Sequence, residues 1–386
     1  MKQILEGSHA VAEAVKLCKP DVVSAYPITP QTHIVERLAE MVADGDLDAE
    51  YICVESEFSA LSACLGSSAA GSRVYSATSS QGLLLMAEVC FNVAGMRQPI
   101  VMSIANRAIS APLSIWNDQQ DSIALRDCGW IQLYAEDAQE VHDFHYIAYK
   151  VAEDHQVLLP VFICFDGFIL SHTYEPVDIP TAEEVNAFLP PYKPYNMLDA
   201  KNPLSMGMYA TPEYYMEFRY EVDQAMMRSA DLLRKVGKEF GEKFGRDYSN
   251  LVEEYRLEDA DVALVAMGSI CGTIKDAIDE MREAGKKVGL LRIVTYRPFP
   301  AEEVQKALKG ITKIGVFEKN LMIGSRMKGA VGYEIKDAVN DSAVQVLSYV
   351  AGLGGRDITI ADIKKMVGEI EAGRGDCFFG LRQELI

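Results

Sequence analysis

The hydrophobic pattern of the first 170 residues alternates between short apolar runs and stretches with helical spacing. Helical stretches include Ser8–Leu17 and Gln31–Val42, and in the second of these Ile34, Leu38, Met41 and Val42 fall on one face. The apolar runs typical of buried strands are Asp21–Tyr26, Tyr51–Val54, Val74–Ala77, Ile100–Ile104, Ile131–Tyr134 and Val161–Phe165. Continuous apolar strands that alternate with helices predict an α/β domain whose parallel sheet is covered on both faces.

This pattern stops at Tyr174. Seven of the 15 prolines lie between Tyr174 and Pro212. Because proline fixes φ and donates no hydrogen bond, we expect an extended connector here, which could wrap around a neighbouring chain. The charged stretch Tyr214–Arg256 has helical composition and is expected to bridge two domains.

A second α/β pattern begins near Asp261. Its predicted strands are Val262–Met267, Val288–Val294 and Ile314–Phe317, and its predicted helices are Thr273–Ala284 and Ala301–Leu308. The chain of 386 residues is also long enough for two domains. We therefore predict a first α/β domain over residues 1–173, a connector and helical bridge over 174–258, and a smaller α/β domain over 259–386.

Charge and composition narrow the possible functions. The chain has 56 acidic and 37 basic residues and a net charge of −19, which disfavours binding to nucleic acid. The N-terminus lacks the basic and apolar regions of a signal peptide. No apolar run approaches the roughly 18 residues that would span a bilayer, so we expect no membrane segment and a cytoplasmic location.

The eight cysteines form no CxxC pair and no spacing typical of an iron–sulfur ligand set. In a cytoplasmic protein we expect them to be free thiols packed in the core. Any iron–sulfur cluster would then belong to another chain.

Two motifs lie where predicted strands lead into helices. In Tyr26–Pro30 (YPITP), Thr29 presents a hydroxyl near a helix N-terminus, where free N–H groups and the helix dipole favour an anion. A turn with a capping threonine explains the same residues. In Val54–Phe58 (VESEF), two carboxylates follow a strand, where parallel sheets bind their ligands. One of them could hold a proton on a heterocyclic nitrogen, or simply interact with the helix dipole.

Two further motifs follow the next strands along the chain. Ala77–Met86 (ATSSQGLLLM) places a polar cluster with glycine before an apolar helix, and helix capping would account for Ser79 and Ser80. In Asn106–Pro112 (NRAISAP), Arg107 follows a strand, where a guanidinium can bind a carboxylate in bidentate fashion. A structural salt bridge is an equally common role for such an arginine.

Several familiar signatures are absent, including GxGxxG, GxxxxGK[ST], HExxH and GxSxG. His142 and His145 lie at helical spacing, but no third ligand is nearby, so they do not predict a metal site. Gly268–Thr273 could hold a phosphate, although a tight structural turn is the better interpretation.

Taken in order, these segments resemble the alpha subunit of multi-subunit 2-oxoacid:ferredoxin oxidoreductases, and most closely the pyruvate enzyme. The motifs that carry the resemblance are YPITP at Tyr26–Pro30, SE at Ser56–Glu57, TSSQGLLLM at Thr78–Met86, NRAISAPLSIWNDQQD at Asn106–Asp121, FDGF at Phe165–Phe168 with Ser171-His172 after it, GSICGTIKDAID at Gly268–Asp279, RPFP at Arg297–Pro300 and AGLGGRD at Ala351–Asp357. The resemblance implies a pyrimidine-type thiamine-diphosphate-binding domain followed by a domain like the C-terminal domain of transketolase.

The resemblance also implies roles for individual residues. Glu57 would hydrogen-bond N1′ of the cofactor's aminopyrimidine, favouring the imino tautomer that removes the C2 proton of the thiazolium. Thr29 and Arg107 would bind the carboxylate of pyruvate, and Ser80 and Gln81 would also contact the cofactor. The implied reaction is the reversible oxidative decarboxylation of pyruvate to acetyl-CoA and CO₂, with electrons passed to ferredoxin.

One feature of thiamine enzymes is missing from this sequence. Such enzymes hold Mg²⁺ and the diphosphate with a Gly-Asp-Gly segment and a distal asparagine, and no Gly-Asp-Gly occurs here. The resemblance places that segment on a beta subunit, with [4Fe-4S] clusters on the beta and delta subunits and a gamma subunit completing the complex. The chain would then supply half of an active site, with coenzyme A as co-substrate.

Other functions fit the same residues. The enzyme could act on branched-chain oxoacids, 2-oxoglutarate or oxalate instead of pyruvate. A subunit of a transketolase-like transferase is another possibility, and a non-catalytic scaffold subunit of an electron-transfer complex is a third. In the scaffold, Glu57 would be dispensable.

Overall fold

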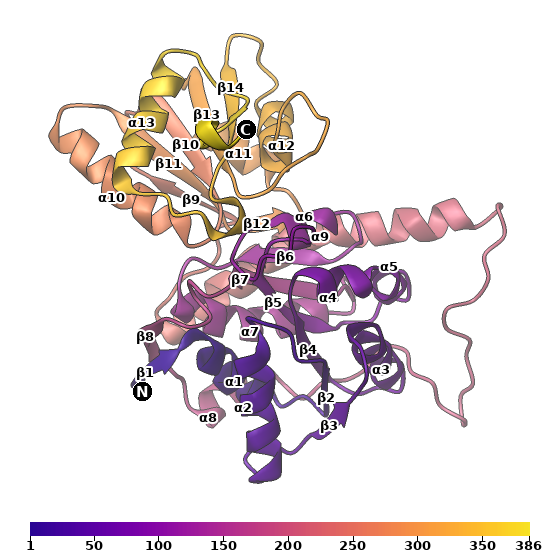
Figure 1. Ribbon diagram of the computed structural model, residues 1–386. Coiled ribbons are helices and arrows are strands. Elements are labelled where there is room, and N and C mark those ends of the chain that lie inside the picture. Colours follow the sequence, from indigo (N-terminus) through magenta and orange to yellow (C-terminus); the bar gives the residue numbers. More distant parts are fainter.

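The computed structural model describes all residues from Met1 to Ile386 and contains two α/β units, which lie below and above the helix α9 in Figure 1. The first unit is built on a seven-stranded sheet with the strand order β12-β6-β7-β5-β4-β2-β3. Its strands are β2 (Val22–Ala25), β3 (Glu50–Cys53), β4 (Val74–Thr78), β5 (Val101–Asn106), β6 (Ile131–Tyr134), β7 (Val161–Asp166) and β12 (Thr295–Arg297). All neighbours pair in parallel except β12, which is antiparallel to β6. The six strands predicted for this region and their parallel arrangement are thus confirmed.

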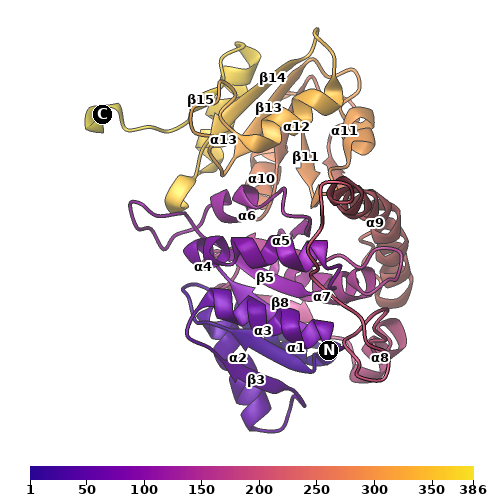
Figure 2. The ribbon, with the colours of Figure 1, turned by 90° about the vertical axis from the view of Figure 1, so that its right-hand side faces the viewer.

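Helices cover both faces of this sheet. On one face lie α1 (Gly7–Cys18), α2 (Thr32–Ala43) and α7 (Ala138–Ala152), which share one apolar core. On the other, turned to the viewer in Figure 2, lie α3 (Glu57–Ala69), α4 (Ser80–Leu85) and α5 (Ala87–Gly95). In α2, Val35 is buried and Val42 only half-buried, so the buried face is rotated slightly from the prediction.

The connector is more ordered than the sequence predicts. Its first residues form β8 (Tyr174–Asp178), which pairs antiparallel with an N-terminal strand, β1 (Lys2–Glu6). The short helix α8 (Ala182–Phe188) follows, with a capping box at Thr181, and it buries Val185 and Phe188. Only the part between α8 and α9 is extended, and it reaches outward at the right of Figure 1. The prediction that Tyr174–Pro212 contains no packed element was wrong. Partners elsewhere in the chain stabilise β8 and α8.

The predicted helical bridge is helix α9, Tyr215–Phe244. It ends at Gly245, whose φ of +77° terminates the helix. The prediction of helix as far as Arg256 was wrong, because Val252–Tyr255 forms a strand, β9. Arg234 of α9 donates to Glu303 in the second unit (Nε to Oε1, 2.9 Å), so α9 contacts both units.

The second unit has a six-stranded sheet with the order β15-β14-β13-β10-β11-β9. Its other strands are β10 (Val262–Ala266), β11 (Val288–Ile293), β13 (Lys313–Glu318), β14 (Gln345–Val350) and β15 (Cys377–Phe378). Its helices are α10 (Ile270–Glu283), α11 (Ala301–Ala307), α12 (Ala330–Val339) and α13 (Ile360–Glu371). The three strands and two helices predicted here are confirmed.

The two units are tightly joined. One apolar core contains residues from both, such as Trp130 of the first and Val304 of the second. Arg292 of β11 forms buried ion pairs with Glu136 and Glu140 of the first unit. The chain therefore presents a fixed junction between the units, as a single body.

Six of the eight cysteines are buried free thiols, as predicted, whereas Cys53 and Cys377 are exposed. None of the helices is both long and apolar enough to cross a membrane.

Candidate active site

The four motifs that follow strands in the first domain meet at one edge of the sheet. Each comes after the carboxyl end of β2, β3, β4 or β5, and these strands run parallel. Parallel strands bring their carboxyl ends to the same edge, which is where such sheets bind ligands. Gln31 fixes the loop after β2 there, because its buried amide donates to the carbonyls of Tyr26 and Ala77, each over 2.9 Å.

Glu57 is the first residue of α3, and its position is set by the helix cap. The Ser56 side chain accepts from Ser59 N over 3.2 Å, as an N-cap does. The Glu57 side chain is buried, with 7% of its surface exposed, yet its carboxylate forms no hydrogen bond or ion pair within the chain. Since buried polar groups are nearly always paired, this carboxylate is available for a ligand.

The turn between β4 and α4 lies against Glu57. A Cβ atom on Gly82 would lie 2.7 Å from Oε1 of Glu57 and 2.5 Å from Oγ1 of Thr78. Only glycine therefore leaves room for the carboxylate. Three buried polar atoms of the same turn also lack partners: Thr78 Oγ1, Ser79 Oγ and Gln81 Nε2. An unpaired carboxylate beside unpaired donors and acceptors fits a polar heterocycle such as an aminopyrimidine.

Arg107 follows β5 and is buried, with 6% of its surface exposed. Its guanidinium donates to the carbonyl oxygens of Thr29 (2.9 Å) and Ser114 (3.0 Å), and more weakly to Gln81 Oε1 (3.4 Å). It forms no salt bridge within the chain, which counts against the alternative of a structural salt bridge. A buried cation without an acidic partner is suited to binding an anionic ligand.

Ser80 and Gln81 connect the two sides of the site. Ser80 has a positive φ of 48°, which is uncommon for a residue with a side chain. Its hydroxyl lies 2.6 Å from Gln81 Oε1 and 2.5 Å from the carbonyl of Ala108. The structure therefore brings Thr29, Ser80, Gln81 and Arg107 into one hydrogen-bonded group, with Glu57 next to Gly82 on its border.

Asp121 holds this group in place, and the sequence did not single it out. Its buried carboxylate accepts from the backbone N–H groups of Ser80 (2.9 Å) and Arg107 (3.0 Å). It also accepts from the side chain of Asn106 (2.7 Å) and from Ser122 N (2.8 Å). Burial raises the pKa of Asp121 to about 7, against hydrogen bonds that lower it. An aspartate in this position gives no sequence signal for such a role, since its distant donors come from the turn after β4 and from the end of β5.

The other candidate ligand sites are satisfied within the protein. His142 lies 2.9 Å from Asp143 and 3.0 Å from Tyr146, and His145 contacts Ser103 and the Val141 carbonyl, so both imidazole rings are hydrogen-bonded within the protein. Glu6, His33 and His172 do cluster, with their ligand atoms within 4.8 Å of one another. His33 is already hydrogen-bonded to Glu6 over 2.6 Å.

The turn at Gly268–Thr273 also has an internal partner. The backbone N–H and hydroxyl of Ser269 donate to Asp166 over 3.0 and 2.5 Å. A protein carboxylate thus occupies the place that a phosphate would need.

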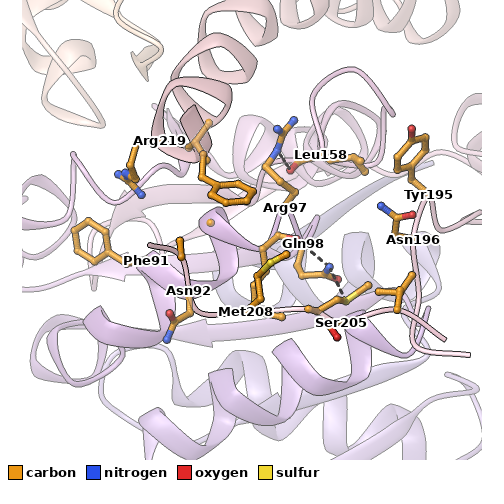
Figure 3. A pocket seen from close by; sticks show the side chains of 18 of the residues that line it. Phe91, Asn92, Arg97, Gln98, Leu158, Tyr195, Asn196, Ser205, Met208 and Arg219 are labelled. Atoms are coloured by element: carbon orange, nitrogen blue, oxygen red, sulfur yellow. Dashed lines mark hydrogen bonds between the residues drawn. The ribbon is translucent and has the colours of Figure 1, made fainter. Parts of the chain in front are cut away.

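A cavity of about 820 Å³ lies away from this edge, between α5, the connector and α9 (Figure 3). Phe91, Met208 and Arg219 line it, as do Gln98 and Met206, which contact each other over 3.8 Å. None of the predicted site residues lines this cavity. Its size alone therefore does not identify the site of chemistry.

Two family models match the chain. The pyruvate flavodoxin/ferredoxin oxidoreductase, thiamine diphosphate-binding model covers residues 13–238, and the pyruvate:ferredoxin oxidoreductase core domain II model covers residues 260–363. The chain belongs to the pyruvate:ferredoxin oxidoreductase family. The first of these models contains every candidate site residue, from Thr29 to Arg107.

Curated relatives in this family align over almost the whole chain. Pyruvate synthase subunit PorA of Methanothermobacter thermautotrophicus is 54% identical over 99% of both chains. PorA of Pyrococcus furiosus is 48% identical over 100% of this chain and 99% of its own. Ketoisovalerate oxidoreductase subunit VorA of Pyrococcus horikoshii is 46% identical over 97% of this chain and 96% of its own.

Solved structures share the fold of this family at low identity. A 2-oxoglutarate:ferredoxin oxidoreductase from Magnetococcus marinus has a TM-score of 0.73 at 19% identity. The match covers 96% of this chain but only 65% of that longer chain. A split-gene transketolase has a TM-score of 0.55 at 10% identity and covers 96% of this chain. Both likenesses concern the fold alone.

Proposed function

We propose that this chain is the alpha subunit of a thiamine-diphosphate-dependent pyruvate:ferredoxin oxidoreductase. The observation that carries the proposal is a pair of buried charged groups at one sheet edge that form no salt bridge within the chain: the carboxylate of Glu57 and the guanidinium of Arg107. The first is suited to a protonated ring nitrogen and the second to a substrate carboxylate. The PorA relatives, at 48–54% identity, support the same function.

In this function Glu57 would hold a proton at N1′ of the aminopyrimidine. Burial without a competing donor would let its carboxylate accept that hydrogen bond fully, in surroundings where electrostatic interactions are stronger than in water. Thr78, Ser79 and Gln81 would offer their unpaired polar atoms to the same ring. Thiamine diphosphate, when bound, supplies the electron sink for decarboxylation.

Arg107 and Thr29 would bind and orient the carboxylate of the 2-oxoacid. The guanidinium already makes hydrogen bonds to two backbone carbonyls, so its plane is fixed before the substrate arrives. The Thr29 side chain is exposed at the site and could add a neutral hydrogen bond. A fixed carboxylate would keep the carbonyl carbon of pyruvate in one place during the reaction.

The remaining parts of the active site would come from other subunits. Because the sequence has no Gly-Asp-Gly segment, a beta subunit would bind Mg²⁺ and the diphosphate. Beta and delta subunits would hold [4Fe-4S] clusters, and a gamma subunit would complete the complex, which acts in the cytoplasm on ferredoxin and coenzyme A. The word "subunit" in the names of the relatives supports an assembly of this kind.

A second candidate substrate is a branched-chain 2-oxoacid, because a ketoisovalerate oxidoreductase subunit is 46% identical. The experiment that tests both is coexpression of the chain with its partner subunits, followed by assays of 2-oxoacid-dependent, coenzyme-A-dependent reduction of ferredoxin. Pyruvate should give the highest kcat/KM among pyruvate, 2-oxoisovalerate and 2-oxoglutarate. A complex that prefers 2-oxoisovalerate would replace the first proposal with the second, and one inactive with every 2-oxoacid would refute both.

A further inference from the structure

The motif Ala351–Asp357 of the second domain follows β14 and lies against the first domain. Its residues Gly352–Gly355, here called the glycine loop, include three glycines with positive φ: Gly352 (+70°), Gly354 (+59°) and Gly355 (+76°). The segment that it contacts is Ala108–Gln119, here called the substrate loop, which follows Arg107. The proposed function assigns no role to the glycine loop.

The glycine loop hydrogen-bonds one end of the substrate loop. The backbone N–H of Gly355 donates to the carbonyl of Asn117 over 2.6 Å, and that of Gly354 donates to Oδ2 of Asp118 over 3.0 Å. A Cβ atom on Gly355 would lie only 2.5 Å from Cβ of Trp116. The two loops are therefore in contact at a position where no larger residue fits.

Lys319, which directly follows β13, hydrogen-bonds the same end of the substrate loop. Its backbone carbonyl accepts from Gln119 N over 2.7 Å, and its ammonium group hydrogen-bonds Asn117 Oδ1. The ammonium group also lies 3.2 Å from the buried carboxylate of Asp166. Burial raises the pKa of Asp166, but Lys319 and the hydrogen bonds outweigh burial, so this pKa lies below its usual range. The ion pair between Lys319 and Asp166 thus joins the two domains beside this end of the loop. Asn117 hydrogen-bonds both of these side chains, so it is held by the first domain as well as by the second.

The middle of the substrate loop contacts Arg107. The carbonyl of Ser114 accepts from Arg107 Nε over 3.0 Å, and the carbonyl of Trp116 accepts from Ala108 N over 3.0 Å. Only Ile115 separates these two carbonyl-bearing residues. The guanidinium is therefore connected to the glycine loop through a few residues of one loop.

We propose that the glycine loop is a positioning element for Arg107, so that the second domain controls how well the 2-oxoacid is bound. The inference rests on the proposed function, because it takes Arg107 as the residue that binds the substrate carboxylate. Residues 110–113 and 115 of the substrate loop are exposed, whereas the Trp116 ring contacts Phe168 of the first domain, with ring centroids 4.8 Å apart. The backbone contacts of Gly354 and Gly355 therefore add to those of the first domain in fixing this loop. A cavity of about 500 Å³ borders the junction and gives a released loop room to move.

The test is Gly355→Ala in the assembled complex, because the added methyl group would push Trp116 and the substrate loop away. Gly310→Ala is the matched control: it lies in the same domain with a similar φ of +87°, and nothing is within 4 Å of its Cβ position. A misplacement of about 1 Å can cost about 10²-fold, so we expect KM for pyruvate to rise at least about tenfold in Gly355→Ala. The affinity for thiamine diphosphate should stay within about twofold of wild type, because only the substrate arginine moves. Gly310→Ala should show neither effect.

A second measurement separates positioning from simple loss of structure. Hydrogen exchange at the amides of residues 108–119 should speed up in Gly355→Ala and not in Gly310→Ala, while exchange in β10 and β13 stays slow in both. If Gly355→Ala does not assemble, Asp118→Asn takes its place, because it weakens the acceptor of Gly354 N without adding bulk, and a raised KM is again expected.

The outcomes distinguish this inference from the proposed function. Faster exchange in the substrate loop with an unchanged KM would overturn the positioning role, and so would equal effects in the two glycine variants. Turnover of the wild-type complex is measured first, because a wild type that is inactive with every 2-oxoacid would overturn the proposed function itself.

Discussion

Arg107 donates a hydrogen bond from Nη1 to the main-chain carbonyl of Thr29, over 2.9 Å, although the two residues are 78 positions apart in the sequence. The two residues expected to bind the substrate carboxylate are thus coupled before any substrate is present. The position of Thr29 depends in part on Arg107, so the effects of substituting them should not be independent.

The first prediction follows from this coupling. Hydrogen bonds to charged groups contribute about 1.5–3 kcal/mol, against about 0.5–1.5 kcal/mol for neutral ones, so Arg107→Ala should lower kcat/KM for pyruvate more than Thr29→Val. Arg107→Lys should recover only part of the loss, since an ammonium group keeps the charge but not the planar fork. In the double variant, the loss should be smaller than the sum of the single losses. Intact pyruvate kinetics together with a lower stability in Arg107→Ala would mean that the residue is structural.

The second prediction concerns Glu57→Gln. The glutamine side chain has nearly the same shape, so the fold and the contact with Gly82 should persist. The neutral amide cannot stabilise a protonated pyrimidine, so exchange of the cofactor's C2 proton should slow by about 10²–10⁴-fold. The measurement is proton exchange at C2 in the assembled complex by NMR after acid quench. Near-normal exchange would contradict the role of Glu57 and favour a non-catalytic scaffold.

The third prediction uses the titration of Asp121. Only the ionised carboxylate can accept all four of its hydrogen bonds, and its pKa is raised to about 7. As pH falls through about 7, protonation should loosen Ser80 and Arg107, and KM for pyruvate should rise. Asp121→Asn should show a raised KM with this part of the pH dependence removed. A pH profile of KM identical in wild type and variant would contradict the assignment.

The raised pKa of Asp121 also makes the stability of the fold depend on pH. Here the loss comes as pH rises, whereas substrate binding weakens as pH falls. Because the folded-state pKa of Asp121 lies above the value of about 3.9 in an unfolded chain, the folded state binds more protons between these values. This group therefore makes unfolding easier as pH rises from about 4 to about 7. Urea unfolding of the chain as a function of pH should show this slope, and Asp121→Asn should lack it.

The fourth prediction concerns the chain by itself. It should fold, since its two units share a buried core, but it should bind thiamine diphosphate weakly. The diphosphate is the main anionic group of the cofactor, and its site is expected on the beta subunit. Calorimetric titration of the lone chain should show weak binding, and addition of the beta subunit should increase the affinity. Tight stoichiometric binding to the lone chain would contradict the half-site proposal.

The fifth prediction concerns the connector. Between α8 and α9 it exposes large apolar side chains, among them Tyr195, Leu198, Met208 and Tyr209. Such a surface is typical of a protein interface. Limited proteolysis of the lone chain should cut between residues 195 and 214, whereas the assembled complex should resist cleavage there. Equally rapid cleavage in both would mean that no partner covers this segment.

The sequence alone determined much of this protein. The central strands of the first domain are continuous apolar runs because they are buried on both faces. The positions of the strands, their parallel pairing and the gathering of four motifs at one edge were therefore predictable. The sequence motifs also pointed to Glu57, Thr29 and Arg107, because each lies in a motif that follows a strand whose end is fixed by that topology.

Tertiary structure decided what depends on partners distant in the sequence. The strand Tyr174–Asp178 contains Pro176 and has weak local preference, but pairing with the N-terminal strand stabilises it. Arg107 needs no carboxylate partner, because its guanidinium hydrogen-bonds the carbonyl oxygens of Thr29 and Ser114. The role of Asp121 depends on donors from the turn after β4 and from the end of β5. Hydrogen-bond partners of this kind leave no periodic signal along the chain, so only the folded arrangement reveals them.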